Sequence, residues 1–568
     1  MKILGFSYDL PISSLCYLKD GKIEFAIAEE RLNRIKNYKG FPELSLSYVL
    51  KKFNLKIKDI DFFVNSWNPA IYFRKFNPLI SQQKRHFSEQ LISFPDNLLK
   101  KQQKKYIGNT NLNFLLNKKN INFEFITHHE CHAGLAFYLS GFKNAIAFIV
   151  DQQGETMSSS VWTINNNKFT KVFSTDFPNS IGKFYASITE YLGFKPLSDE
   201  WKVMALGAYS KNYSETYKKL KKIININNNG TFDLDTNYFN LINEKENLLS
   251  EKFYSIFGGP RNNEDKLKKM HYDIAASLQK IVEETIISMI SKFLKKYPHK
   301  NLCLSGGVFM NSVMNGKIAE KFKNNNIYIP YAPDDSGNSI GAALFKYFAN
   351  SKRKNYHYKK NSLPYKGCSY NSKNIEKILK KFKIKYRKEK NLNHFICKSL
   401  ENKKVIAYFQ GNMEFGQRAL GSRSIIASPK FSSMKKTVNE SIKYRESFRP
   451  FAPAVLDKHV TKIFKVSKKH KSDYMEKVFF FKDKYKKKYP AVVHADGSGR
   501  IMTVNENSNF KFKELLDYYE KKFNCPIILN TSFNVKGEPI VESPESAIKT
   551  FFSSGLDILI LEDFIVEK

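Results

Sequence analysis

Two similar strand–turn–strand units, which begin about 140 residues apart, limit the folds open to this chain. In each unit an apolar strand is followed by two more, and a short polar turn typical of a β-hairpin joins those two. The first unit covers residues 2–28 with the turn 19–22, and the second covers 145–173 with the turn 165–168. Helical sequence follows both units. The repeat predicts an internally duplicated α/β domain.

Two glycine-rich turns lie in the second half of this predicted domain. Ser305-Gly306-Gly307 and Ser336-Gly337-Asn338 each join a predicted strand to a predicted helix. Glycine at such a turn lets backbone N–H groups approach a phosphate at a helix N-terminus. Duplicated α/β domains such as the actin-like ATPases bind nucleotides, so a nucleotide site is expected here. Turn geometry alone is the alternative explanation for each glycine.

A second α/β domain is predicted after residue 370. The stretch 351–370 is rich in Lys, Asn and Tyr and has little apolar periodicity, which indicates a boundary. Strands are predicted beyond it, for example at Val405–Phe409 and Pro526–Leu529. The expected domains are 1–355 and 371–568, with a linker at 356–370.

The chain has a net charge of +39, but its basic residues do not indicate a nucleic-acid surface. Only 12 of the 93 basic residues are arginine, and the lysines are spread along the whole length. A nucleic-acid interface would place basic and aromatic residues together on one face. Dispersed lysines indicate a solvated surface, so no nucleic-acid partner is expected.

The compartment is predicted from cysteine usage and hydropathy. The six cysteines have no CxxC spacing, which favours a reducing compartment. No apolar run approaches the ~18 residues of a membrane-spanning helix. We expect a soluble cytoplasmic protein.

Three of the 11 histidines lie within the five residues 128–132. On a helix, His128 and His132 are one turn apart on the same face. Asp151 and Asp335 each follow a predicted strand, and strand-end carboxylates of α/β folds point into the ligand crevice. Two imidazoles with two carboxylates suit iron, zinc or manganese. A hydrogen-bonded structural cluster is the alternative.

Five of the 12 arginines fall within residues 418–500, near glycine and serine: Arg418, Arg423, Arg445, Arg449 and Arg500. Arginine binds phosphate and carboxylate in a bidentate manner. Clustered cations repel one another unless an anion, or glutamates such as Glu414 and Glu446, neutralise them. We favour an oxyanion site over an ordinary salt-bridge network.

Together these motifs resemble the NodU/CmcH family of O-carbamoyltransferases over nearly the whole length. The matching strings are Ala28–Leu32 with Arg34, His128–Ala133, Tyr191–Phe194 with Lys202–Met204, Leu304–Val308 with Asn311, Met413–Gly416 with Arg418–Gly421, Arg445–Pro453, and Asn530–Asn534 with Gly537–Pro539.

The resemblance implies two sites. A C-terminal YrdC-like domain would form carbamoyl-adenylate from carbamoyl phosphate and ATP, with Mg²⁺ as a possible companion of ATP. The residues implied are Arg418, Lys443, Arg449, Arg500, Asn530 and Ser532.

An N-terminal actin-like domain, similar to the tRNA threonylcarbamoyl transferases, would pass the carbamoyl group to a hydroxyl of a small-molecule or sugar acceptor. The family's ferrous ion, or another divalent metal, maps onto His128, His132, Asp151 and Asp335. The nucleotide-binding positions implied are Gly306, Gly307, Asn311, Gly337 and Lys202.

The chain departs from the family pattern near its start. Where the family carries a His-Asp-Ser run, this chain has Tyr8-Asp9-Leu10, so no role can be assigned to a histidine there. Gln417 stands where proline is common. The general base stays open between a carboxylate and His129, and segment 68–105, expected to shape the acceptor site, carries no readable motif. Neither the acceptor nor the oligomeric state can be read from the sequence.

Two other enzymatic functions remain. An actin-like ATPase or sugar kinase explains the duplication and the glycine turns but not the arginines or the histidine pair. A tRNA threonylcarbamoyl-type transferase fits the first domain. Only the carbamoyltransferase should require carbamoyl phosphate.

Overall fold

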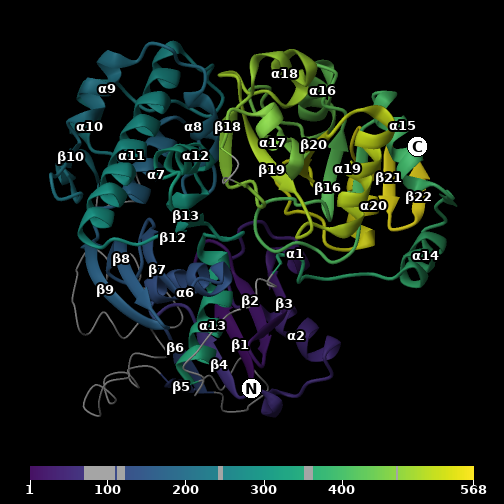
Figure 1. Ribbon diagram of the computed structural model, residues 1–568, viewed down its shortest axis with the longest axis horizontal. Coiled ribbons are helices and arrows are strands. Elements are labelled where there is room, and N and C mark those ends of the chain that lie inside the picture. The colour runs from purple at the N-terminus through teal and green to yellow at the C-terminus, as the bar shows by residue number, and fades with distance from the viewer. Residues whose placement is uncertain (69–108, 112–121, 241–246, 351–362, 468–470) are drawn as a thin grey trace. The chain divides into compact units, whose positions relative to one another are not determined.

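The computed structural model describes residues 1–68, 109–111, 122–240, 247–350, 363–467 and 471–568 (Figure 1). Most of the segment 68–105 and part of the predicted linker, 356–362, lie outside the described residues. The chain forms two compact units. Unit 1 comprises 1–29, 37–311 and 324–362, and unit 2 comprises 30–36, 312–323 and 363–568.

Unit 1 contains two sheets with the same topology. The first has the order β3-β2-β1-β4-β6-β5, and the second has the order β13-β12-β7-β8-β9. In each sheet three consecutive strands form an antiparallel meander. The first strand of the meander pairs in parallel with a fourth strand, and the fourth pairs in parallel with a fifth. Only β5 has no counterpart. The predicted duplication and α/β class are therefore confirmed.

The two meanders coincide closely with the units predicted at 2–28 and 145–173. The strands of both sheets are β1 Lys2–Ser7, β2 Ser14–Lys19, β3 Lys22–Ala28, β4 Phe62–Asn65, β5 Asn109–Asn111, β6 Asn122–Phe125, β7 Asn144–Val150, β8 Met157–Asn165, β9 Lys168–Asp176, β12 Asn301–Ser305 and β13 Asn326–Tyr328. The first hairpin turns at Asp20 and Gly21, whose φ angles of 49° and 81° are those of a type I′ turn.

The helices of unit 1 fall into two groups. Helices α6 and α13 pack against each other, and α13 also packs on β1 (Figure 1). Helices α7, α8 and α9 each contact the long helix α11. Helix α9 also contacts β10, which forms a small hairpin with β11. The bounds are α2 Glu43–Lys52, α6 His128–Ser140, α7 Ile181–Tyr191, α8 Glu200–Gly207, α9 Ser214–Lys221, β10 Ile224–Ile226, β11 Phe232–Leu234, α10 Glu251–Phe257, α11 Lys269–Lys296 and α13 Asn338–Asn350.

Unit 2 is built on a nine-stranded mixed sheet, the α/β architecture predicted for the C-terminal domain. The strand order is β14-β22-β21-β15-β16-β20-β17-β19-β18. The bounds are β14 Arg387–Lys388, β15 Ile406–Phe409, β16 Arg423–Ala427, β17 Ala452–Leu456, β18 Lys477–Phe480, β19 Ser498–Val504, β20 Ile527–Ser532, β21 Ile558–Leu561 and β22 Phe564–Glu567. Its central strands are buried on both faces, which explains why they read as continuous apolar runs.

Two short segments from within the range expected for the first domain belong to unit 2. One contains α1, Glu30–Asn33, and the other contains α12, Ser312–Lys321, which packs on β18. Both lie inside the range 1–355 expected for the first domain, whose boundary stays a prediction. The remaining helices are α14 Ser372–Lys381, α15 Leu392–Glu401, α16 Ser433–Thr437, α17 Asp457–Ile463, α18 Asp483–Lys488, α19 Phe510–Phe523 and α20 Pro544–Phe552.

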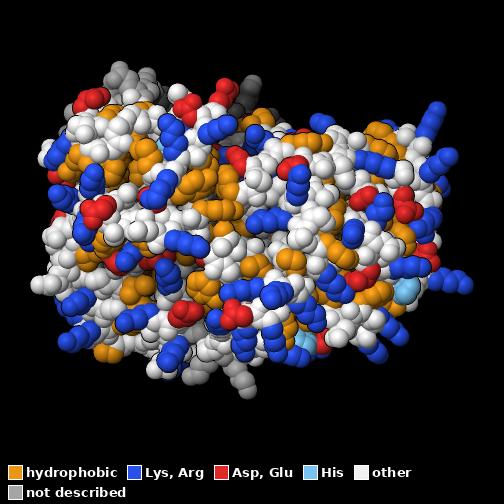
Figure 2. All heavy atoms as spheres, turned by 90° about the horizontal axis from the view of Figure 1, so that it is seen from above, with side chains coloured by type: hydrophobic (Ala, Val, Ile, Leu, Met, Phe, Trp, Pro, Cys, Tyr) orange, Lys and Arg blue, Asp and Glu red, His pale blue; other side chains and the backbone are white. Residues whose placement is uncertain are grey.

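Basic side chains are numerous on the face shown in Figure 2, but they are not concentrated into one patch. Lys and Arg side chains are spread across that face, with acidic and apolar side chains between them. None of the helices in the described part of the chain is long and apolar enough to cross a membrane.

Candidate metal centre and anion site

Helix α6 carries the histidine pair into the interior of unit 1. His128 is its first residue, and His132 follows one turn later on the same face. Both imidazoles are fully buried, and their Nε2 atoms lie 3.1 Å apart. Glu155 supports the start of the helix, because its Oε1 accepts the backbone N–H of His128 at 2.9 Å.

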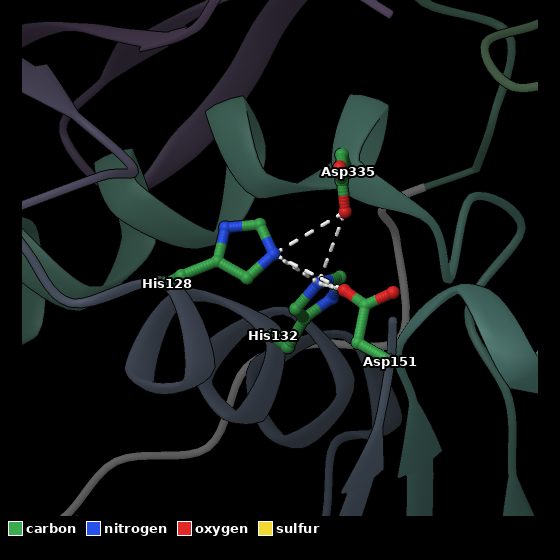
Figure 3. Close-up of side chains that lie close together, drawn as sticks. All are labelled: His128, His132, Asp151 and Asp335. Atoms are coloured by element: carbon green, nitrogen blue, oxygen red, sulfur yellow. Dashed lines mark hydrogen bonds and ion pairs between the residues drawn. The ribbon is translucent and has the colours of Figure 1, made fainter. Parts of the chain in front are cut away.

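Two carboxylates complete a cluster of four side chains (Figure 3). Asp151 follows β7, and its Oδ2 lies 3.1 Å from the Nε2 atoms of both histidines. Asp335 begins the turn before α13, and its Oδ1 lies 3.3 Å from His128 Nε2 and 3.5 Å from His132 Nε2. The four candidate ligand atoms lie within 4.8 Å of one another. The sequence positions predicted as metal ligands are thus brought together, and metal binding by them stays a prediction.

The outer atoms of the cluster hold each ligand in place. Asp151 Oδ1 accepts the N–H groups of Gln152 at 2.8 Å and Gly307 at 3.2 Å, which leaves Oδ2 facing the histidines. His132 Nδ1 lies 3.3 Å from Ser305 Oγ, which itself donates to the Pro333 carbonyl. A Nδ1–H donor of this kind leaves the Nε2 lone pair for a metal.

Asn338 plays the corresponding part for His128. Its Nδ2 lies 3.3 Å from His128 Nδ1, while its buried Oδ1 has no hydrogen-bond partner among the described residues. Turning the amide by 180° would let Oδ1 accept a hydrogen bond from the Nδ1–H group of His128 and so satisfy both groups. Both histidines would then present Nε2 lone pairs to the same point.

The electrostatics of the cluster favour a cation. Burial by itself lowers the pKa of His128, but Asp335 and Asp151 outweigh it and raise this pKa to about 10. Burial raises the pKa of Asp151, and hydrogen bonds from His128 and His132 more than reverse this, leaving it well below its usual value. The buried carboxylate of Asp151, the partly exposed carboxylate of Asp335 and two Nε2 atoms converge on one point and form a donor set that suits iron, zinc or manganese.

His129 does not join this cluster. Its Nδ1 lies 2.8 Å from Ser160 Oγ, which also accepts from Trp162 Nε1 at 2.8 Å. Burial, followed by the charges of His128 and His132, lowers the pKa of His129 well below its usual value. The ring is therefore neutral and held by Ser160.

The predicted glycine turns have packing roles in the structure. Gly306 has φ 102°, and a Cβ there would lie 2.2 Å from the carbonyl oxygen of Val150. A Cβ on Gly307 would lie 2.9 Å from Asp151 Oδ1, and one on Gly337 would lie 2.0 Å from Ala332 O. Gly306 and Gly307 thus link the turn after β12 directly to the end of β7 and to the metal cluster.

Asn311 and Lys202, the other nucleotide-binding candidates, both have protein partners. Asn311 Nδ2 donates to Gln279 Oε1 at 2.8 Å, and Gln279 Nε2 donates back to Asn311 Oδ1 at 3.1 Å. Gln279 also contacts Glu283 and Tyr185. Lys202 Nζ pairs with Asp199 at 2.8 Å and lies over the Phe194 ring.

In unit 2, the side chain of Lys443 contacts the end of β20 and the residues that follow it. Lys443 and the arginines around it, Arg418, Arg445, Arg449 and Arg500, form the candidate anion site. The Nζ of Lys443 donates to the Ser532 carbonyl at 2.5 Å and to Asn534 O and Oδ1 at 2.9 and 2.7 Å. Ser532 Oγ in turn donates to Asn534 Oδ1 at 2.7 Å. Burial, Arg445, Arg449 and Lys36, in that order, lower the pKa of Lys443 well below its usual value.

The arginines nearby repel one another. Burial, then Arg418 and Arg445, lower the pKa of Arg500 well below its usual value. Burial and Arg449 likewise lower the pKa of Arg445, which Glu446 only partly offsets. Glu446 pairs with Arg449 at 2.5 Å. Because these cations repel one another, a phosphate-bearing anion would stabilise this arrangement.

Asn530 lies in the same part of unit 2, and Arg423 has a different role. Asn530 Nδ2 donates to the Ala419 carbonyl at 3.0 Å, next to Arg418, and its buried Oδ1 has no partner among the described residues. Arg423 is fully buried over the Phe409 ring and donates to backbone carbonyls, among them Gly411 O and Cys368 O. The expectation that Arg423 joins the oxyanion cluster is therefore wrong.

Sequence reasoning missed several supporting residues. Gln279 and Glu155 carry no local signal, because their partners are distant in sequence. Asn338 was visible only as part of a glycine turn. His494 was also missed: its Nε2 is buried without a hydrogen-bond partner among the described residues, and burial lowers its pKa to about 4. Its position six residues before Arg500, in a Gly-Ser loop, was the available hint.

Comparisons with known proteins cover the full chain. The family described as carbamoyltransferase N-terminus matches residues 2–344, and carbamoyltransferase C-terminus matches residues 397–568. An uncharacterized protein of Synechocystis is 33% identical over 100% of this chain and 96% of the relative. The nodulation protein NolNO of Sinorhizobium fredii is 29% identical over 100% of this chain and 81% of its own length.

A solved structure, component A of (R)-2-hydroxyglutaryl-CoA dehydratase from Acidaminococcus fermentans, is 18% identical. It covers 61% of this chain and 98% of its own, with a TM-score of 0.33. A TM-score this low supports no inference about the chain.

Proposed function

Because the chain belongs to the carbamoyltransferase family, of the NodU/CmcH type, and is a transferase enzyme, we propose that it is an O-carbamoyltransferase with two sites. Unit 2 would form carbamoyl-adenylate from carbamoyl phosphate and ATP, with Mg²⁺ accompanying ATP. Unit 1 would transfer the carbamoyl group to a hydroxyl of a sugar or another small molecule. The cluster of mutually repelling cations in unit 2, with Lys443 and Arg449 buried and Arg418, Arg445 and Arg500 partly exposed, is the observation that carries this proposal.

The cations of unit 2 match the charges of the first half-reaction. Carbamoyl phosphate is a dianion, and ATP brings further negative charge to the same residues. With one water, carbamoyl phosphate gives inorganic phosphate and carbamate, whose oxygen then displaces pyrophosphate from the α-phosphorus of ATP. Arg418, Arg449 and Arg500 would bind the phosphates and stabilise charge on the groups that leave. Lys443 would hold Ser532 and the strand end beside them.

In unit 1, His128, His132, Asp151 and Asp335 would hold a divalent metal, which we propose to be Fe²⁺. When bound, such an ion acts as a Lewis acid toward a carbonyl oxygen. Ser305 and Asn338 would fix the histidine tautomers, and Gly307 would orient Asp151. The acceptor hydroxyl would attack the carbamoyl carbon, AMP would leave, and the hydroxyl proton would be released to water.

The six cysteines support a cytoplasmic location for this reaction. None of the six forms a disulfide bond, and all are buried. Cysteines that form no disulfide bonds are typical of a reducing compartment.

The first half-reaction is tested without an acceptor. Purified protein is incubated with ATP and carbamoyl phosphate, and pyrophosphate and carbamoyl-AMP are measured by coupled assay and mass spectrometry. We expect both products from the wild type and neither from Arg418→Ala. Arg387→Met, which alters an exposed arginine of unit 2 paired with Glu389 and Glu567, is the matched control and should retain both. ATP turnover that does not depend on carbamoyl phosphate would instead favour a kinase.

A further inference from the structure

Arg31 belongs to unit 2, although it lies near the start of the sequence. The residue is 5% exposed, and its Nη2 donates to the Gly416 carbonyl at 3.0 Å. Gly416 has φ 101°, a conformation that favours glycine, and it lies two residues before Arg418. Arg31 therefore fixes the turn from which Arg418 extends.

Arg34 makes an equivalent contact with a second loop. Its Nη1 donates to the Ile540 carbonyl at 2.6 Å, and its Nη2 donates to Pro539 O at 2.9 Å. These carbonyls end the loop that begins after Ser532 at the end of β20. Lys443 holds the beginning of that loop, and Asn534 Nδ2 ties its two ends through Glu538 O at 2.7 Å.

Lys36 adds charge to the same place. It is exposed, and it is close enough to Lys443 for its charge to contribute to the lowered pKa of that lysine. A positive charge at this exposed position attracts a phosphate-bearing anion.

We propose that residues 30–36 form part of the anion site of unit 2. Arg31 and Arg34 act as positioning residues for the Arg418 turn and the Ser532 loop, and Lys36 attracts the phosphate-bearing substrate. This inference rests on the proposed function only in naming carbamoyl phosphate as that substrate. It implies that residues 363–568 alone do not contain a complete first site.

The alternative is that Arg31 and Arg34 only stabilise the fold of unit 2 and do not affect ligand binding. Both roles predict a loss of thermal stability when an arginine is removed. Only the positioning role predicts that Arg31 acts through Arg418, so that removing both residues costs little more than removing Arg418 alone.

The test uses the full chain and the variants Arg31→Met, Arg34→Met, Lys36→Gln and the conservative Arg31→Lys. Arg387→Met is again the matched control. Binding of inorganic phosphate is measured by calorimetry, and KM for carbamoyl phosphate is measured through pyrophosphate release. Lys36→Gln changes an exposed side chain, so it tests the inference even if the arginine variants do not fold.

We expect Arg31→Met and Arg34→Met to weaken phosphate binding and raise KM about tenfold each, the effect of losing one charge-assisted contact. Arg31→Lys should recover part of the loss. Lys36→Gln should raise KM roughly threefold and reduce the dependence on salt. In the Arg418→Ala background, Arg31→Met should change phosphate affinity less than about twofold.

Unchanged phosphate affinity in Arg31→Met, Arg34→Met and Lys36→Gln would overturn the inference. If Arg31→Met weakened phosphate binding by the same factor in the Arg418→Ala background as in the wild type, the positioning role would be overturned. A wild type that binds phosphate but forms no carbamoyl-AMP would contradict the proposed function alone, because the phosphate measurements would still test the anion site.

Discussion

At the scale of single residues, unit 2 uses arginine in two opposite ways. Arg423 is buried with backbone carbonyls as its acceptors, so its charge is satisfied by the protein itself. Arg500 is held near Arg418 and Arg445, and its buried Nε has no hydrogen-bond partner among the described residues. One guanidinium stabilises the fold, while the other is available for an anion.

This difference predicts opposite outcomes for the same substitution. Arg423→Met should lower the free energy of unfolding by about 3–5 kcal/mol, because it leaves several buried carbonyls without donors. Arg500→Met should leave the free energy of unfolding unchanged or raise it slightly, because it removes a repelling charge, and should abolish stabilisation by phosphate. Urea unfolding with and without phosphate measures both. Equal destabilisation by the two variants would contradict the assignment.

At the scale of elements, the turn after β12 links the two possible ligand sites of unit 1. Gly306 allows the chain to pass against the carbonyl of Val150, and Gly307 then donates its N–H to Asp151. The metal cluster and the predicted nucleotide turn therefore depend on one backbone conformation.

A side chain at position 306 should disturb both the metal cluster and the predicted nucleotide turn. Gly306→Ala places a Cβ 2.2 Å from Val150 O at a φ of 102°, and should cost about 2–4 kcal/mol of unfolding free energy. Gly259→Ala is the matched control, because a Cβ there meets no atom within 4 Å, and should change stability by less than about 0.5 kcal/mol. Urea denaturation and metal content of the purified variants are measured together. A Gly306→Ala protein with wild-type stability would refute the packing argument.

At the scale of the whole molecule, the proposed function assigns one half-reaction to each unit. His132→Ala should lose bound metal and lower carbamoyl transfer by about a hundredfold or more, while pyrophosphate release continues. Arg418→Ala should keep its metal but make no adenylate. Supplying carbamoyl-AMP directly should restore transfer in Arg418→Ala and not in His132→Ala.

The measurements are metal content by mass spectrometry, pyrophosphate release, and carbamoylated product from a panel of sugars. Loss of pyrophosphate release in His132→Ala would show that the half-reactions do not divide in this way. Failure of carbamoyl-AMP to restore transfer in Arg418→Ala would have the same meaning.

The duplication and the strands of both repeats were predictable from the sequence, because short apolar runs and the polar turns that join them are local signals. The sequence also placed four candidate metal ligands, since one helical turn fixes the histidine spacing and strand ends fix the carboxylates. Only the tertiary structure decided the rest. The burial of Arg423, the pairing of Asn311 with Gln279, and the inclusion of residues 30–36 and 312–323 in unit 2 depend on contacts between residues far apart in the chain. Such contacts leave no local pattern, because packing and charge around a side chain are set only when distant segments meet.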